Sequence, residues 1–155
     1  MVTILHKTGS TLKDYLHNFG FNKKVKILAD TGVFELEMRK ARLSKFDKYL
    51  TKLHTLKTTE IFHAYNLIDP DFLVAPDEMI LIGDSVQDQE LKKQQIKENL
   101  HKTLIEFSKS KIIATIQGLD QRVISEITHH IQEEKITKVA RGGLLPLRKH
   151  SRSKF

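Results

Sequence analysis

The stretch Phe72-Leu73-Val74-Ala75-Pro76-Asp77-Glu78 joins an uninterrupted apolar run to a proline and two acids. Four apolar residues without polar alternation are typical of a parallel strand that is buried on both faces. Pro76 and Asp77 favour a turn, so we expect the strand to end there. In α/β proteins, ligands bind beyond the carboxyl ends of parallel strands. The stretch therefore predicts a fold class and also the position of a site.

Three other segments predict strands that alternate with helices. The strands are expected at 25–29, 111–116 and 137–140. Helices are predicted from apolar residues at i, i+3, i+4 and i+7 and from capping pairs such as Ser85 and Asp88. They cover 11–20, 44–53, 60–66, 85–108 and 123–131, and the polar stretch 92–99 is expected to form a solvent-exposed helix face. Alternating strands and helices predict βαβ units and a parallel sheet.

Each expected strand ends in polar or glycine residues, namely Asp30, Asp77, Gln117 and Gly142-Gly143. Right-handed crossovers bring these ends to one edge of the sheet. Two carboxylates and an amide could read the hydrogen-bonding edge of a polar heterocycle, and a guanine edge fits Asp77 better than an adenine edge. Phe34 could stack on its ring. The alternative is that these are ordinary turn residues.

The net charge of +7 is concentrated near the C-terminus. After Glu134 there is no acid, and there are seven bases: Lys135, Lys138, Arg141, Arg148, Lys149, Arg152 and Lys154. Such a segment commonly contacts nucleic-acid phosphates. A solubilising terminal segment is the equal alternative.

The composition excludes several classes of protein. The 155 residues contain no cysteine, which excludes disulfides, thiolate metal sites and a cysteine nucleophile. No apolar run reaches membrane length, and no signal peptide is evident. His129 and His130 diverge by about 100° on a helix, so they form no same-face metal pair. We expect a cytoplasmic protein without a metal, a cofactor or a membrane partner.

The strand-end motifs, in this order, resemble the middle of the tRNA-guanine transglycosylases, TIM barrels that exchange a guanine in tRNA for a 7-deazaguanine base. Leu16-His17-Asn18-Phe19-Gly20-Phe21 resembles the segment before the family's first active-site strand. Asp30-Thr31-Gly32-Val33-Phe34-Glu35 resembles its Asp-Ser-Gly-Gly-(Tyr/Phe)-Gln motif. The remaining matches are Val74-Ala75-Pro76-Asp77-Glu78, Ile116-Gln117-Gly118 and Ala140-Arg141-Gly142-Gly143-Leu144.

The resemblance assigns a role to each matching position. It implies a part in the chemistry for Asp30, stacking on the base for Phe34, and recognition of the base edge for Asp77 and Gln117. It also implies a backbone lining of the pocket by Gly142, Gly143 and Leu144. Arg148, Lys149, Arg152 and Lys154 would contact the nucleic-acid backbone.

The departures from the family pattern shape the expected organisation. Val33 and Glu35 differ from the first motif. The family's nucleophilic aspartate and its Cys3His zinc site belong to later segments than those matched here. We therefore expect a partial, half-barrel-like TIM barrel of parallel (β/α) units over 1–147 and a basic tail over 148–155. A second copy or another polypeptide would supply the missing strands.

Three functions are consistent with these features. The first is base exchange on tRNA or DNA by a transglycosylase-like pentosyltransferase, a step in queuosine- or archaeosine-type tRNA modification, with guanine or a 7-deazaguanine as the bound base. The second is a non-catalytic RNA-binding subunit of such a complex. The third is an unrelated small α/β protein whose strand ends match by chance. Whether the chain is itself an enzyme stays open at this point.

Overall fold

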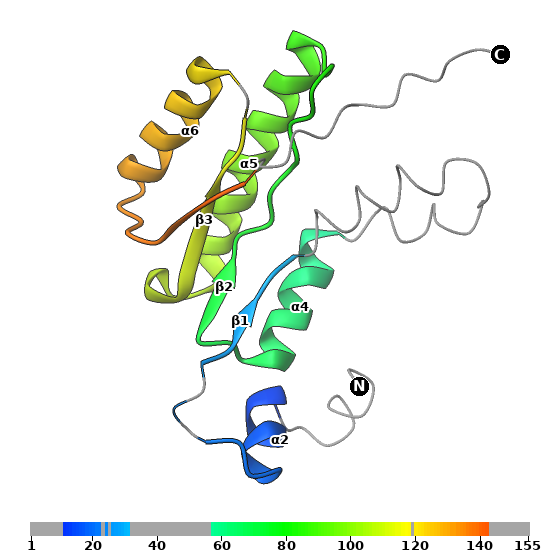
Figure 1. Ribbon diagram of the computed structural model, residues 1–155, viewed down its shortest axis with the longest axis vertical. Helices are drawn as coiled ribbons and strands as arrows, with labels where there is room; N and C mark the ends of the chain where they lie inside the picture. The colour runs from blue at the N-terminus through cyan, green and yellow to red at the C-terminus, as the bar shows by residue number, and fades with distance from the viewer. Residues whose placement is uncertain (1–10, 23, 25, 32–56, 119, 143–155) are drawn as a thin grey trace, which may run out of the picture.

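The computed structural model describes residues 11–22, 24, 26–31, 57–118 and 120–142. Four strands and four α-helices follow one another along the chain (Figure 1), with a short 3-10 helix, η2, before the third strand. Their bounds are α2 Leu12–Asn18, β1 Leu28–Ala29, α4 Thr58–Ile68, β2 Phe72–Val74, α5 Val86–Glu106, η2 Lys109–Lys111, β3 Ile112–Ile116, α6 Gln121–Glu133 and β4 Val139–Arg141. Each predicted strand is found, although β1 has only two residues. The helix predicted at 44–53 lies outside the described residues.

The four strands form one parallel sheet in the order β1-β2-β3-β4. Leu73 pairs with Ala29 on one side and with Ile112 on the other. Ala114 continues the ladder to Val139 of β4. The predicted α/β class with parallel (β/α) units is therefore confirmed, and the described strands form an open sheet that does not close into a barrel.

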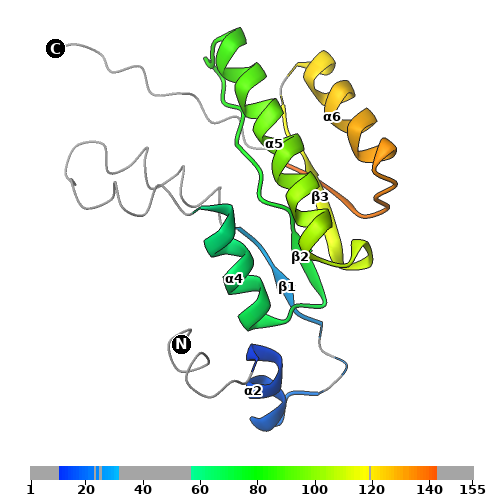
Figure 2. The same ribbon diagram turned by 180° about the vertical axis from the view of Figure 1, so that it is seen from behind.

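The connecting helices form one layer against the sheet. A right-handed crossover between neighbouring strands, repeated in the same direction, puts every helix on the same face. β3 lies in front of α5 in Figure 1 and behind it in Figure 2, with α4 and α6 on either side of α5. None of the helices described by the structure is long and apolar enough to cross a membrane.

The core lies between the sheet and this helix layer. Leu73, Ile112 and Ala114 have no solvent exposure. They pack in one cluster with apolar side chains of α5 and α6: Ile96, Leu100, Val123, Ile127 and Ile131. Burial of this kind contributes roughly 25 cal/mol per Å² of apolar surface and supplies most of the driving force for folding. The sequence pattern of period 3.6 on α6 identifies its buried face correctly.

The expected solvent-exposed stretch on α5 is wrong in part. Lys93, Ile96 and Asn99 are all buried. The Lys93 ammonium lies between α5 and α6, where it pairs with Glu126 and, at 2.6 Å, with Glu90. Polar composition predicts exposure to solvent, but a lysine can be buried when carboxylates satisfy its charge. The sequence pattern therefore did not reveal this contact.

Ion pairs hold the amino-terminal edge of the sheet. Asp71, directly before β2, accepts hydrogen bonds from the Ile27 N–H at 2.9 Å and from Lys13 at 2.9 Å, and it also pairs with Lys26 at 3.3 Å. The bond from Ile27, followed by that from Lys13, holds the pKa of the Asp71 carboxyl well below its usual range. The carboxylate thus fastens the segment before the short β1 to the next strand.

Candidate functional site

Asp77 is positioned by the end of β2. The Ala75 N–H donates to the Ile113 carbonyl at 3.0 Å, so pairing with β3 continues one residue past the strand. Tyr65 of α4 donates its hydroxyl to the Val74 carbonyl at 2.7 Å. Pro76, which has no N–H, then ends the ladder. These contacts hold the backbone just before Asp77, whose side chain is buried.

Gln117 meets Asp77 from the neighbouring strand. It follows β3 directly, and the Gly142 N–H donates to the Ile116 carbonyl at 2.9 Å to hold β4 beside it. The Gln117 Nε2 donates to Asp77 Oδ2 at 2.6 Å in a buried hydrogen bond. Three of the four predicted strand-end positions, Asp77, Gln117 and Gly142, therefore come together at one edge of the sheet.

Gly142 leaves room for the Gln117 amide. A Cβ at position 142 would lie 2.2 Å from Nε2 and 2.7 Å from Oε1 of Gln117. No side chain fits at that distance, so any other residue would push the amide away from Asp77. The glycine was expected to bring its backbone close to a ligand; in the structure it is the Gln117 side chain that occupies this space.

The site is electrostatically unusual. Burial raises the pKa of Asp77, and the negative charge of Asp30 raises it further, while the hydrogen bond from Gln117 acts in the opposite direction. Burial also raises the pKa of the Tyr65 hydroxyl, with contributions from Asp30 and Asp77. Within the described residues no lysine or arginine forms an ion pair with Asp77, and its carboxyl is held by hydrogen bonds from the Gln117 amide and from its own backbone.

Asp30 lies at the same edge but in a different environment. It follows β1 directly and is exposed, and its Oδ1 accepts a hydrogen bond from the Thr31 N–H at 2.7 Å. Its charge acts on both Asp77 and Tyr65. An exposed carboxylate and a buried carboxyl therefore lie at the same edge of the sheet.

The other predicted site residues fall outside the described part of the chain. They are Phe34, Gly143, Leu144, Arg148, Lys149, Arg152 and Lys154.

Two buried oxygens at this edge have no hydrogen-bond partner in the described structure: Gln117 Oε1 and Thr115 Oγ1. Sequence reasoning missed Thr115, although its place two residues before Gln117 puts both side chains on one face of the strand. It also missed Tyr65, for which no local signal exists, because its contact with β2 joins a helix to a strand. Buried polar atoms of this kind require an explanation in a native protein.

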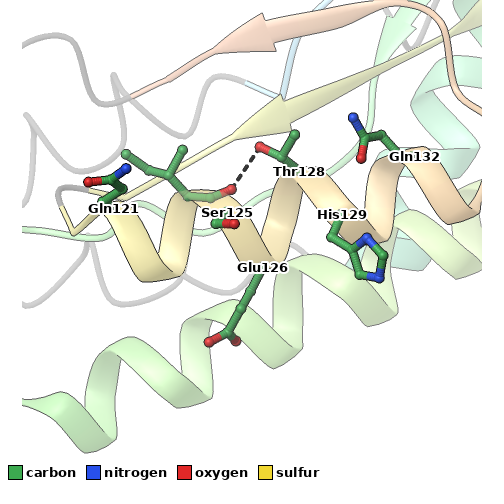
Figure 3. A pocket seen from close by; sticks show the side chains of 7 residues that line it. Gln121, Ser125, Glu126, Thr128, His129 and Gln132 are labelled. Carbon is green, nitrogen blue, oxygen red and sulfur yellow. Dashed lines mark hydrogen bonds between the residues drawn. The ribbon is translucent and has the colours of Figure 1, made fainter.

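A concave region lies on the exposed side of α6, away from the sheet edge. Figure 3 shows the side chains that line this depression, with Thr128 bonded to the Ile124 carbonyl at 2.7 Å. All of its lining residues come from one helix, and none belongs to the cluster at the sheet edge. Its two titratable lining residues already have partners, since Glu126 pairs with Lys93 and His129 Nε2 lies 3.3 Å from a Glu133 carboxylate oxygen. The sheet edge is therefore the better candidate.

A carboxyl and an amide side by side can read a planar edge that offers N–H groups. In the part of the chain that the structure describes, no group of three or more His, Cys, Asp or Glu side chains could hold a metal ion. The chain matches no known protein-family model, and no curated protein matches it.

Proposed function

We propose that this chain binds a guanine or 7-deazaguanine base at Asp77 and Gln117 and takes part in base exchange of the tRNA-guanine transglycosylase type. The observation that carries the proposal is the buried hydrogen bond between these two side chains. They come from different strands and are exposed by 8% and 4%. A buried carboxyl that has no counter-cation among the described residues is costly for a fold, which argues for a purpose in binding.

The chemistry of the pair favours a guanine-type edge. An aspartate carboxylate accepts two parallel N–H bonds, and guanine offers adjacent ring and exocyclic N–H groups. Adenine offers one donor beside an acceptor, so it would satisfy Asp77 less well. The Gln117 Oε1 atom, which has no partner among the described residues, can accept an N–H.

The proposed reaction requires groups beyond the base-binding pair. Displacing a base from a pentose needs a nucleophile at the anomeric carbon, and the resembled enzymes use an aspartate. In our proposal Asp30 acts on the reacting base or sugar, and the attacking carboxylate comes from a second copy or another polypeptide. The partner would pair with an open edge of the sheet, where β1 and β4 are the outer described strands. In this proposal tRNA or DNA is the polymeric substrate, and the cytoplasm is the place of action.

Calorimetric titration with 7-deazaguanine tests the binding step. The wild-type chain should bind it and should not bind adenine, while Asp77→Asn should weaken binding at least about tenfold because an amide places a donor against the ligand's N–H. Asp69→Asn is the matched control, since it removes a carboxylate at the opposite end of the sheet that pairs with Lys111. Absence of wild-type binding at millimolar ligand would overturn the proposal.

A second candidate function follows from the basic C-terminal segment. Seven bases and no acid follow Glu134, as expected of a non-catalytic subunit that contacts RNA phosphates. Such a subunit would bind tRNA with an affinity that falls steeply with salt. Truncation after Pro146 would abolish tRNA binding, and Asp77→Asn would leave tRNA binding intact. The base-binding proposal instead requires Asp77→Asn to weaken the binding of 7-deazaguanine.

A further inference from the structure

Thr115 and Gln117 place two unpartnered oxygens on the same face of β3. The two residues are exposed by only 8% and 4%, and neither Thr115 Oγ1 nor Gln117 Oε1 has a hydrogen-bond partner among the described residues. Because side chains alternate along a strand, both lie on the face opposite to Ile112 and Ala114, which pack against the helices. Their positions along the strand differ by roughly 6.6 Å, two residue repeats.

The buried polar side chains of α5 are satisfied, whereas Nε2 of His130 on α6 is, like the two oxygens, buried without a partner among the described residues. Thr103, fully buried on α5, donates its hydroxyl to the Asn99 carbonyl at 2.6 Å. The Asn99 side chain in turn accepts from Thr58 and Gln95, each at 3.2 Å. A buried hydroxyl or amide oxygen without a partner is unfavourable, so a pair of them on one face indicates that something polar binds there.

The neighbouring residues beside these two oxygens are small. Thr115 is in register with Ala140 of β4, and the Gln117 amide lies against Gly142. The two β4 positions beside the unpartnered oxygens thus carry no side chain larger than a methyl group. A flat bicyclic ring is long enough to reach from Gln117 to Thr115 along the strand.

We propose that Thr115 is a specificity-determining residue of the base pocket, where its hydroxyl and Gln117 Oε1 bind two polar groups of the same purine-type base. The inference rests on the proposed function and adds to it a contact that the motif resemblance does not contain. Gln117 Oε1 can only accept, so the base must present an N–H to it. The Thr115 hydroxyl can donate, so it suits a carbonyl or ring-nitrogen acceptor further along the base.

The test compares Thr115→Val with Thr115→Ser and Thr103→Val, using 7-deazaguanine titration and thermal melting of the full chain. Valine keeps the shape of threonine and removes the hydroxyl. Thr115→Val should weaken binding about tenfold with an unchanged or higher melting temperature, because it removes a buried group that has no partner. Thr115→Ser should bind as the wild type does. Thr103→Val should melt lower and bind normally, because it loses a hydrogen bond that is made.

Each other outcome is decisive. If Thr115→Val binds as tightly as the wild type while Asp77→Asn binds weakly, Thr115 contacts no ligand, and the base-binding proposal stands without it. If Thr115→Val melts lower, as expected of Thr103→Val, the hydroxyl has a structural partner and the inference is wrong. If the wild type does not bind 7-deazaguanine at all, both proposals fall.

Discussion

Two aspartates flank β2, and their environments are opposite. Asp71 precedes the strand and is held by the Ile27 N–H, Lys13 and Lys26. Asp77 follows the strand, is buried, and is bonded by Gln117. The pKa of the Asp71 carboxyl is lowered, mainly by hydrogen bonds, and that of Asp77 is raised, mainly by burial.

The contrast separates a stabilising end of the sheet from a binding end. At the amino-terminal edge the carboxylates of Asp69 and Asp71 have lysine partners. At the carboxyl-terminal edge Asp77 and Gln117 are buried, and Gln117 Oε1 has no hydrogen-bond partner among the described residues. The same division holds for α/β barrels in general, where one face of the barrel carries stability and the other carries the active site.

Asp71→Asn should give the largest change in stability among the variants at the two ends. It removes the charge that attracts Lys13 and Lys26 and weakens the tie to Ile27. Because the native pKa of Asp71 is lowered, its contribution is present above the ordinary value near 3.8 and is lost as the pH falls through the native pKa. Urea unfolding at neutral pH should show a lower midpoint for the variant, with the difference disappearing in acid.

Asp120→Asn is the matched control for Asp71→Asn. Asp120 caps α6 through a bond from the Arg122 N–H at 2.7 Å, and asparagine caps a helix about as well as aspartate. Its unfolding midpoint should stay near the wild-type value. An equal loss in both variants would show that the amino-terminal ion pairs add nothing to stability.

Asp77→Asn should change stability less and in the opposite direction. The native pKa of Asp77 is raised, so between its ordinary value near 3.8 and the native value the folded chain holds a proton that the unfolded chain has released. Wild-type stability therefore falls as the pH rises through this range, and asparagine removes the penalty. We expect the variant to be more stable than the wild type at neutral pH and equally stable in acid, measured by urea unfolding at both. A loss at neutral pH would contradict the view that function rather than stability explains this carboxyl.

Gly142→Ala should have the smallest effect on stability but a large effect on the site. The atoms that a Cβ would meet belong to the end of the Gln117 side chain, which can swing aside at little cost. The amide then leaves Asp77, and 7-deazaguanine binding should fall about as far as in Asp77→Asn. The free energy of unfolding should stay within roughly 0.5 kcal/mol of the wild-type value.

Gly20→Ala provides the contrast to Gly142→Ala. Gly20 has a φ of +84° and no heavy atom within 4 Å of an added Cβ. Alanine there is strained by roughly 1 kcal/mol or more but touches nothing in the site, so stability should fall while binding of 7-deazaguanine is retained. Retained binding in Gly142→Ala would mean that the Gln117 position is unimportant for the ligand.

The repeating strand and helix patterns made much of this fold predictable. Apolar runs at 72–75 and 111–116 predict β2 and β3, and the shared direction of parallel strands predicts that Asp77 and Gln117 lie on a common edge. These signals are local, since they depend on residue spacing and on the shared direction of parallel strands. The length of β1 was harder to predict. Only Leu28 and Ala29 of the expected strand at 25–29 pair with β2, and the Ile27 N–H before them donates to Asp71.

The buried polar contacts could not be predicted in this way. Lys93 was expected in solvent, and its burial depends on Glu126, which lies on a different helix. The sequence pattern predicts only that Tyr65 lies on the apolar face of an amphipathic helix, yet its hydroxyl donates a hydrogen bond to the Val74 carbonyl. The two residues of such a pair are not related by the regular spacing of a helix or a strand, so composition and spacing do not reveal the contact.

The sequence by itself determined the α/β class, the parallel order of strands and the chemical character of the edge residues, because periodicity and turn chemistry act within a few residues. The tertiary structure decided that Asp77 and Gln117 bond to each other, that Gly142 makes room for their contact, and that the Thr115 hydroxyl is buried without a partner among the described residues. Those outcomes depend on the packing of β2, β3 and β4 side by side, and packing sets which polar groups lose water and which of them find a partner.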